Sequence, residues 1–166
     1  MAKPYILLLS CLALCLQYAS ALSGFEAGCL AEHNKYRVKH GASPLQWDST
    51  LAAHARAWAS KLASGAVPPG THDMESGEGE NIAWAESQEI TCELAVQAWM
   101  DELNIYKSDG YCANPPSMPD HNVMHFTQIV WKSTTKVGVA KVGVWLVARY
   151  DPPGNWGGEF GSKVQC

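Results

Sequence analysis

The sequence predicts an α+β domain built in layers, and three observations lead to this fold class. The chain has 166 residues, 47% of them apolar and 17% charged, which is the size and composition of one globular domain. Helical periodicity dominates the first two-thirds of the chain, whereas β-branched and aromatic residues gather in the last third. Segregated helices and strands favour helices packed on a sheet, with room for one shallow site.

The first element is predicted to be a signal peptide over residues 1–21. Lys3 supplies a positive start, residues 5–16 an apolar stretch, and Ala19-Ser20-Ala21 the small residues that signal peptidase cleaves after. A buried N-terminal core helix is the alternative. We expect a mature domain of residues 22–166 that is secreted and extracellular, and no integral membrane segment within it.

Cleavage would remove Cys11 and Cys15 and leave an even number of cysteines for an oxidising compartment, which implies two disulfides. Three pairings are open for the four that remain, and one of them is disfavoured. A helix over residues 91–106 holds its ends about 22 Å apart, whereas residues 107–112 reach back at most about 20 Å. A bond between Cys92 and Cys112 is therefore not expected. The four cysteines are Cys29, Cys92, Cys112 and Cys166.

Charge is unevenly distributed along the chain. Without Lys3 the mature domain has 11 basic and 16 acidic residues, a net charge of −5, which disfavours nucleic acid or an anionic membrane as partner. No Lys or Arg occurs from Leu62 to Tyr106. This region predicts a cationic guest, with a solvated acidic face as the alternative. Its nine carboxylates are Asp73, Glu75, Glu78, Glu80, Glu86, Glu89, Glu93, Asp101 and Glu102.

Three helices are predicted from apolar residues at helical spacing. The first covers Phe25–His40 and stops at a glycine, and the second runs from the N-cap Asp48 to about Gly65. The third begins at Thr91, another N-cap residue, and continues to Tyr106.

The remaining segments are predicted to be loops and one hairpin. Residues 65–80 and 107–122 are rich in Gly and Pro and indicate loops. The segments Val137–Ala140 and Val144–Ala148 have strand composition, and Gly143 between them indicates a tight antiparallel turn.

Three residues stand out as candidates for chemistry, and Glu102 is the first. It follows Trp99 by three positions and precedes Tyr106 by four, so it lies on the apolar stripe of the third helix. Burying an unpaired carboxylate costs several kcal/mol, so we expect a histidine, a cation or a metal opposite it. A structural pair with Arg56 or Arg37 is the alternative.

The second and third candidates are histidines. His72 and Glu80 are eight residues apart with two glycines between them, which gives enough slack for their side chains to meet. His125 stands beside aromatic residues, where a histidine is more often part of the core than a ligand. No Gly-x-Ser-x-Gly, His-Glu-x-x-His or Cys-x-x-Cys motif supports a familiar hydrolase or redox site.

Four motifs, in order, resemble the CAP superfamily of cysteine-rich secretory proteins, insect venom allergens and plant pathogenesis-related proteins of the first class. They are His33-Asn34-x-x-Arg37, Gly79-Glu-Asn-Ile-Ala-Trp84, the stretch from His125 to Thr134, and the stretch from Leu146 to Trp156. The resemblance extends over residues 25–166 and is strongest to the plant, fungal and Golgi-associated branch.

The resemblance implies a three-layer α/β/α sandwich whose central cleft is lined by two histidines and two glutamates. By motif these are His72, His125, Glu80 and Glu102, with Zn²⁺ held by the histidines. It also implies a monomeric binding protein that takes a sterol or fatty acid in a groove between helices, in defence or host interaction. A zinc-dependent hydrolase with Glu80 or Glu102 as general base is one alternative, and an extracellular signalling or structural protein is another.

The chain departs from the family pattern at two positions. Met124 replaces the usual glycine before the histidine, where its bulk would narrow the cleft or tilt His125. Ala148 replaces a common cysteine, so the usual disulfide through that strand is not expected.

Overall fold

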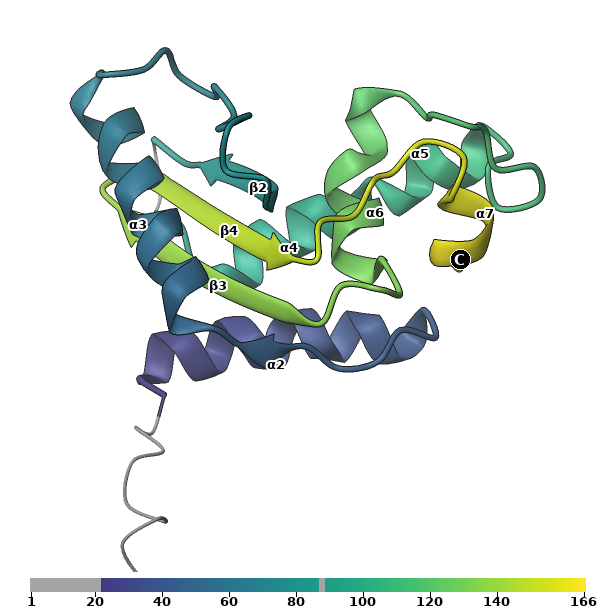
Figure 1. Cartoon of the computed structure of the whole chain (residues 1–166), viewed down its shortest axis with the longest axis horizontal. Coiled ribbons are helices and arrows are strands. Elements are labelled where there is room, and N and C mark those ends of the chain that lie inside the picture. The colour runs from purple at the N-terminus through teal and green to yellow at the C-terminus, as the bar shows by residue number, and fades with distance from the viewer. Residues whose placement is uncertain (1–21, 87–88) are drawn as a thin grey trace, which may run out of the picture.

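The computed structural model describes residues 22–86 and 89–166, so the predicted signal peptide lies outside the described residues. Helices precede and follow the two longest strands, and two shorter strands lie between the earlier helices (Figure 1). In order they are α2 (Gly24–Lys39), β1 (Gln46–Trp47), α3 (Ser49–Ser64), β2 (Gly79–Trp84), α4 (Cys92–Asp101), α5 (Leu103–Ser108), η1 (His121–Val123), α6 (Met124–Val130), β3 (Lys136–Val142), β4 (Trp145–Asp151) and α7 (Phe160–Lys163).

The strands form one four-stranded sheet in the order β1-β3-β4-β2. The pair β3–β4 is antiparallel, as the sequence predicts, and β2 also pairs with β4 in antiparallel, whereas the two-residue β1 adds to the edge of β3 in parallel. In this register Glu80 of β2 lies directly opposite Arg149 of β4. The sheet thus places one site residue beside a cation that lies 69 positions later in the chain.

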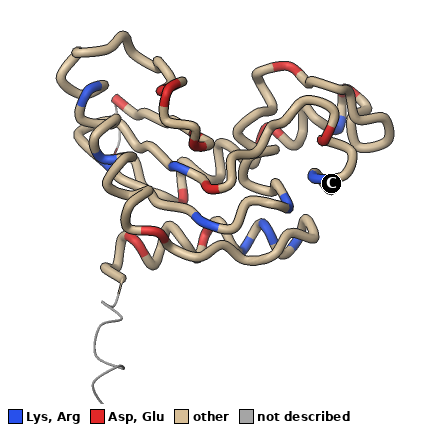
Figure 2. Tube along the Cα trace, in the orientation of Figure 1, with Lys and Arg blue, Asp and Glu red and all other residues tan. Residues whose placement is uncertain are grey.

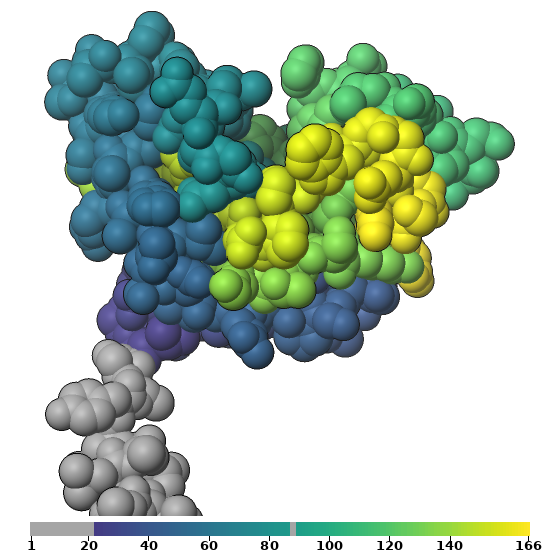
Figure 3. Space-filling model, viewed as in Figure 1, coloured from purple at the N-terminus to yellow at the C-terminus, as the bar shows by residue number. Residues whose placement is uncertain are grey.

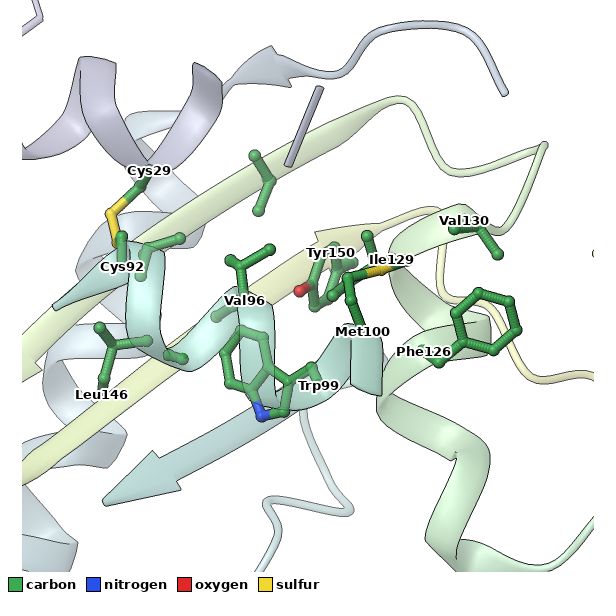
Figure 4. Packing of buried hydrophobic residues seen from close by; sticks show 14 of the residues in the cluster. Cys29, Cys92, Val96, Trp99, Met100, Phe126, Ile129, Val130, Leu146 and Tyr150 are labelled. Atoms are coloured by element: carbon green, nitrogen blue, oxygen red, sulfur yellow. A yellow bond between two sulfur atoms is a disulfide. The ribbon is translucent and has the colours of Figure 1, made fainter. Parts of the chain in front are cut away.

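Helices cover both faces of this sheet, which confirms the layered α+β fold. Helix α3 packs across β3 and β4 on one face (Figure 1), with Trp58 and Leu62 in the core between them. The approach is close, because a Cβ on Gly138 of β3 would overlap the backbone of Leu51 and Ala52. Helices α2, α4 and α6 pack together around the other core cluster, where Trp99, Phe126 and Tyr150 are buried (Figure 4).

The predicted helices are present, and local signals set their ends. Ser23 and Glu26 form a capping box at the start of α2, and the Asp48 carboxylate accepts the N–H groups of Thr50 and Leu51 at the start of α3. Gly65 ends α3 in the left-handed conformation at φ 71°. The single helix predicted over residues 91–106 is instead two helices, α4 and α5, interrupted at Glu102.

The predicted hairpin is confirmed, with longer strands than the sequence suggests and Gly143 in its turn at φ 58°. Strand β2 and helix α6 are elements that the sequence pattern does not predict. None of the described helices is long and apolar enough to cross a membrane.

Two disulfides join distant segments, and neither is the disfavoured Cys92–Cys112 pair. One connects Cys29 of α2 to Cys92 at the start of α4 (Figure 4). The other connects Cys112, in the Pro-rich loop after α5, to Cys166 near the C-terminal helix. The four cysteines of the described residues are therefore paired, as expected for a domain made in an oxidising compartment.

Candidate functional site: two histidine–carboxylate pairs

Glu102 and His125 form the first of two pairs, which we call the His125 pair. Glu102 occupies the break between α4 and α5, where its Oε1 accepts a hydrogen bond from His125 Nδ1 at 2.6 Å. Its Oε2 accepts the backbone N–H groups of His125 and Phe126, each at 3.0 Å. Both N–H groups belong to the first turn of α6, which has no other helical partner for them. The predicted histidine partner of Glu102 is confirmed.

The ring of His125 is fixed from its face as well. It stacks on the indole of Trp99, with ring centroids 5.9 Å apart and planes at 18°. Trp99 is itself held by a hydrogen bond from Nε1 to the carbonyl of Ile82 at 3.3 Å. The His125 ring therefore has one orientation, set by a carboxylate at its edge and an indole on its face.

Arg37 is not the partner of Glu102. Burial lowers the pKa of this guanidinium to about 10, and its nitrogens donate to backbone carbonyl groups. The acceptors are Ser43, Ile129, Trp131 and Thr134. Arg37 thus ties the loop after α6 to α2, and the structural ion pair considered from the sequence does not form.

His72 and Glu80 form the second pair, the His72 pair. His72 Nδ1 donates to Glu80 Oε1 at 2.6 Å, and the backbone N–H of Asp73 donates to the same oxygen at 3.1 Å. The Glu80 side chain is only 5% exposed, whereas the His72 ring is 45% exposed. The pairing that the two intervening glycines allowed is confirmed.

Arg149 is the residue that sequence reasoning missed. It is fully buried in β4, and its Nη2 lies 2.8 Å from Glu80 Oε2. A signal was present, because Arg149 is the one charged residue in the apolar run from Val144 to Tyr150. A cation in a buried strand needs anionic partners, and here Glu80 is one of them.

A buried chain of hydrogen bonds joins the two pairs. Asn81, next to Glu80 in β2, donates from Nδ2 to the carbonyl of His125 at 3.1 Å and to the hydroxyl of Tyr150 at 3.2 Å. The Tyr150 hydroxyl lies 2.9 Å from His33 Nε2, and His33 Nδ1 lies 2.8 Å from the carbonyl of Cys29. Asn81 therefore holds β2 and the start of α6 in fixed relation.

The ionisation of this chain fits its hydrogen bonds. Burial lowers the pKa of His33 to about 4, so the ring is neutral, donates to Cys29 and accepts from Tyr150. Burial also raises the pKa of Tyr150 far above its ordinary value, which keeps its hydroxyl protonated. The chain is a neutral structural support.

A cavity of about 330 Å³ opens beside the His72 pair. His72 and Glu80 line it together with Gln128 and the segment 153–156 that follows β4, whereas His125 and Glu102 do not. Figure 3 shows a hollow between the teal residues that precede β2 and the green and yellow segments of the last part of the chain. Acidic positions occur along the chain before β2, and a basic position occurs on β4 (Figure 2).

The two pairs have the donor set of a two-histidine metal site. Each ring uses Nδ1 on a carboxylate, which leaves Nε2 as the atom available to a metal, the usual second-shell arrangement of zinc ligands. Within residues 22–86 and 89–166 there is no cluster of three or more His, Cys, Asp or Glu that could hold a metal ion. Any metal here would rest on two imidazoles, with its other positions open.

A larger hollow, of about 830 Å³, lies between the start of α2, helix α3 and β3. Its lining mixes apolar side chains such as Phe25 and Val139 with the cationic Arg56 and Lys141. Glu26 and Glu89 also line this hollow, and Glu89 pairs with Lys141 at 2.9 Å.

The family follows from comparison with known proteins. The family model described as "CAP: Cysteine-rich secretory protein family" matches residues 30–145. The chain belongs to the CAP family. It is 34% identical to pathogenesis-related protein 1A of Nicotiana tabacum over 164 residues, which is 94% of this chain and 93% of the relative. It is also 34% identical to the human Golgi-associated plant pathogenesis-related protein 1, over 82% of this chain and 88% of that protein.

Solved CAP structures have the same fold. Schistosoma mansoni venom allergen-like protein 4 superposes with a TM-score of 0.60 at 21% identity, covering 80% of this chain and 91% of that one. NaASP2, solved with Zn²⁺, superposes with a TM-score of 0.61 at 21% identity, covering 84% and 86%. Both likenesses concern the fold.

Proposed function

We propose that this CAP protein is a secreted binding protein whose His72 and His125 hold a divalent cation such as Zn²⁺. The observation that carries the proposal is that both histidines of the cleft motifs direct Nδ1 at a carboxylate at 2.6 Å, His72 at Glu80 and His125 at Glu102. His54 and Glu78 make a third contact of this kind outside those motifs. A carboxylate on Nδ1 fixes the tautomer and makes Nε2 a better ligand. A single pair of this kind is common in proteins. The His72 and His125 pairs are in addition linked through Asn81, which follows Glu80 and donates to the carbonyl of His125, and this link supports a shared site.

When bound, the cation would supply a Lewis-acid centre with open positions for water or for a polar group of a ligand. The chain's own residues would orient the imidazoles and exclude water from their Nδ1 edges. The NaASP2 structure, solved with Zn²⁺, is a precedent in the same fold. The acidic region from Leu62 to Tyr106 already has a cation from the chain itself, because Arg149 contacts Asp73, Glu78 and Glu80.

The setting we propose is defence or host interaction outside the cell. Pathogenesis-related proteins of Nicotiana tabacum and Solanum lycopersicum are among the relatives, and two disulfides fit an oxidising compartment. Another relative is named as Golgi-associated, and the Golgi is part of the same secretory route.

A fatty acid is the second proposed ligand, in the hollow of about 830 Å³. The cationic Arg56 on its lining favours a ligand with a carboxylate over a sterol. Phe25 and Val139 offer apolar contact for an alkyl chain, and Arg56 on the same lining would meet its carboxylate, whereas Lys141 is already paired with Glu89. Labelled fatty acids should bind Arg56→Gln more weakly than wild type. Lys107→Gln, which removes an exposed lysine elsewhere, is the control and should bind like wild type.

Calorimetry with Zn²⁺ alone tests the metal site. We expect wild type to bind, His72→Ala and His125→Ala to bind at least tenfold more weakly, and the double variant to bind no better than background. His121→Ala is the matched control, because His121 is an exposed histidine on η1 outside both pairs. Lowering the pH from about 7 to about 5.5 should weaken binding, because protonated imidazole cannot ligate. A double variant that binds like wild type would show that the site is elsewhere.

A further inference from the structure

The loop that carries His72 has little apolar contact to hold it. We call residues 71–78 the His72 loop. Met74, its one large apolar residue, is 88% exposed, and His72 and Glu75 are exposed as well. Gly77 has a positive φ of 69°, a conformation that glycine adopts at no steric cost. Hydrophobic burial therefore does not fix this loop, although His72 meets Glu80 at 2.6 Å.

One buried side chain contacts the loop at several points. Arg149 Nη2 lies 3.0 Å from Asp73 Oδ2, and Nη1 donates to Ser76 Oγ at 2.6 Å and lies 3.6 Å from Glu78 Oε2. The same Nη2 lies 2.8 Å from Glu80 Oε2. The guanidinium thus binds both the loop and the carboxylate that receives His72.

Trp58 of α3 holds both the start of the loop and Arg149. Its Nε1 donates to the carbonyl of Thr71 at 2.9 Å, and the Arg149 Cζ lies 5.9 Å from its ring centroid. Arg149 is also fixed by its strand, since β4 pairs on both sides, with β2 and β3. A rigid cation therefore stands beneath a loop that lacks an apolar anchor.

We propose that Arg149 is the positioning residue for His72 in the metal site. Through Asp73 and Ser76 it fixes the His72 loop, and through Glu80 it fixes the acceptor, so that His72 Nδ1 and Glu80 Oε1 meet. The part that concerns Zn²⁺ rests on the proposed function, whereas the placement of the ring does not.

Arg149 could instead act only by neutralising the nearby carboxylates, and its contacts distinguish that role from positioning. Lysine would keep the positive charge, but only a planar guanidinium can direct separate N–H groups at Ser76 and at the carboxylates. Similarly, Asp73→Asn and Glu75→Gln each remove one negative charge from the same loop, yet only Asp73 contacts Arg149. Glu75 is thus a matched control for Asp73.

The test uses the mature protein and two readouts, on Arg149→Lys, Asp73→Asn and the control Glu75→Gln. The first readout is ¹⁵N NMR of the histidine rings without metal, which reports the tautomer of His72, with His125 as internal reference. We expect mixed tautomers for His72 in Arg149→Lys and Asp73→Asn, and an unchanged His125. The second is Zn²⁺ calorimetry, in which these two variants should bind about 10- to 100-fold more weakly and Glu75→Gln within about twofold of wild type.

Each outcome decides between the roles. If Asp73→Asn and Glu75→Gln leave His72 equally unchanged, or disturb it equally, Arg149 is not a positioning residue. If wild type binds no Zn²⁺, the proposed function fails, and the metal-free NMR still decides the placement of His72. Should Arg149→Lys fail to fold, Asp73→Asn together with Ser76→Ala provides the same comparison, because each removes one contact and leaves the buried cation paired with Glu80.

Discussion

The His125 pair and the His72 pair each have a contact of 2.6 Å between Nδ1 and a carboxylate, but different groups hold the two pairs in place. Glu102 accepts two backbone N–H groups at the start of α6, whereas Glu80 accepts one backbone N–H, that of Asp73, and its other oxygen lies beside the side chain of Arg149. His125 is on a helix and stacks on Trp99, whereas His72 is on a loop whose apolar contacts are few.

Two pairs of equal geometry can therefore differ in how well they tolerate substitution of the neighbouring side chains. The backbone donors for Glu102 exist whatever side chains α6 carries, as long as the helix forms. Glu80 Oε1 keeps His72 and the backbone N–H of Asp73, but its Oε2 faces the single side chain of Arg149, and replacing that side chain removes the counter-charge of a buried carboxylate. Four substitutions test this contrast, in order of decreasing expected effect.

Arg149→Met should have the largest effect, because it removes the cation from a buried ion pair. We expect a loss of about 3 to 5 kcal/mol in the free energy of unfolding, measured by urea denaturation. Lys136→Met on β3 is the control, since Lys136 is a half-exposed cation on the same sheet, with expected cost below about 1 kcal/mol. Equal losses in the two variants would show that burial of Arg149 carries no special weight.

His33→Gln tests the support shared by both pairs through its pH dependence. His33 has a folded-state pKa of about 4 against an ordinary value of 6.5, chiefly because of burial. Below pH 6.5 the unfolded chain binds a proton that the folded protein excludes, so stability is full above pH 6.5 and falls as the pH approaches 4.

The loss from this group should be on the order of 3 kcal/mol between those limits, and His33→Gln should lack it. Urea titrations at several pH values measure the slope, with His121→Gln as the exposed-histidine control. A His33→Gln slope equal to that of wild type would mean that another group sets the acid sensitivity.

Glu102→Gln distinguishes a binding site from an enzyme. If Glu102 only orients His125, the amide should cost about 1 to 3 kcal/mol, because its single oxygen cannot accept both from His125 Nδ1 and from the backbone N–H groups of His125 and Phe126. Thermal melts measure this, with Glu93→Gln on the exposed face of α4 as control.

The hydrolase alternative predicts a different result for the same variant. A general base replaced by its amide lowers turnover about 10²- to 10⁴-fold with the structure intact. Zinc-dependent turnover of a peptide, ester or phosphodiester by wild type, lost in a Glu102→Gln protein that melts like wild type, would refute the binding-protein proposal.

His54→Ala should have the smallest effect, although His54 Nδ1 also lies 2.6 Å from a carboxylate, that of Glu78. The His54 side chain is half-exposed, and exposed ion pairs contribute about 0 to 1 kcal/mol. Urea denaturation measures the change. A loss above about 2 kcal/mol would show that the His72 loop is held from α3 rather than from Arg149.

Local patterns account for most of the helical fold and for part of the site. Capping residues and apolar spacing predicted α2, α3 and the start of α4, and a glycine predicted the hairpin turn. The amphipathic stripe placed Glu102 among apolar residues, and its need for a partner followed from the cost of burying charge. The break of the helix at that same residue was not predicted, because an unbroken stripe of apolar residues gives no sign of it.

Local sequence was enough to predict the elements with strong periodicity, an even number of cysteines after residue 21 and, through the motifs, the four candidate site residues. Only the tertiary structure decided that Cys29 bonds Cys92, that Glu102 uses the backbone of α6, and that Arg149 serves the loop of His72. The physical reason is separation along the chain. A periodic pattern reports which face of an element is buried, whereas a hydrogen bond between residues 73 and 149 depends on how whole strands and helices pack.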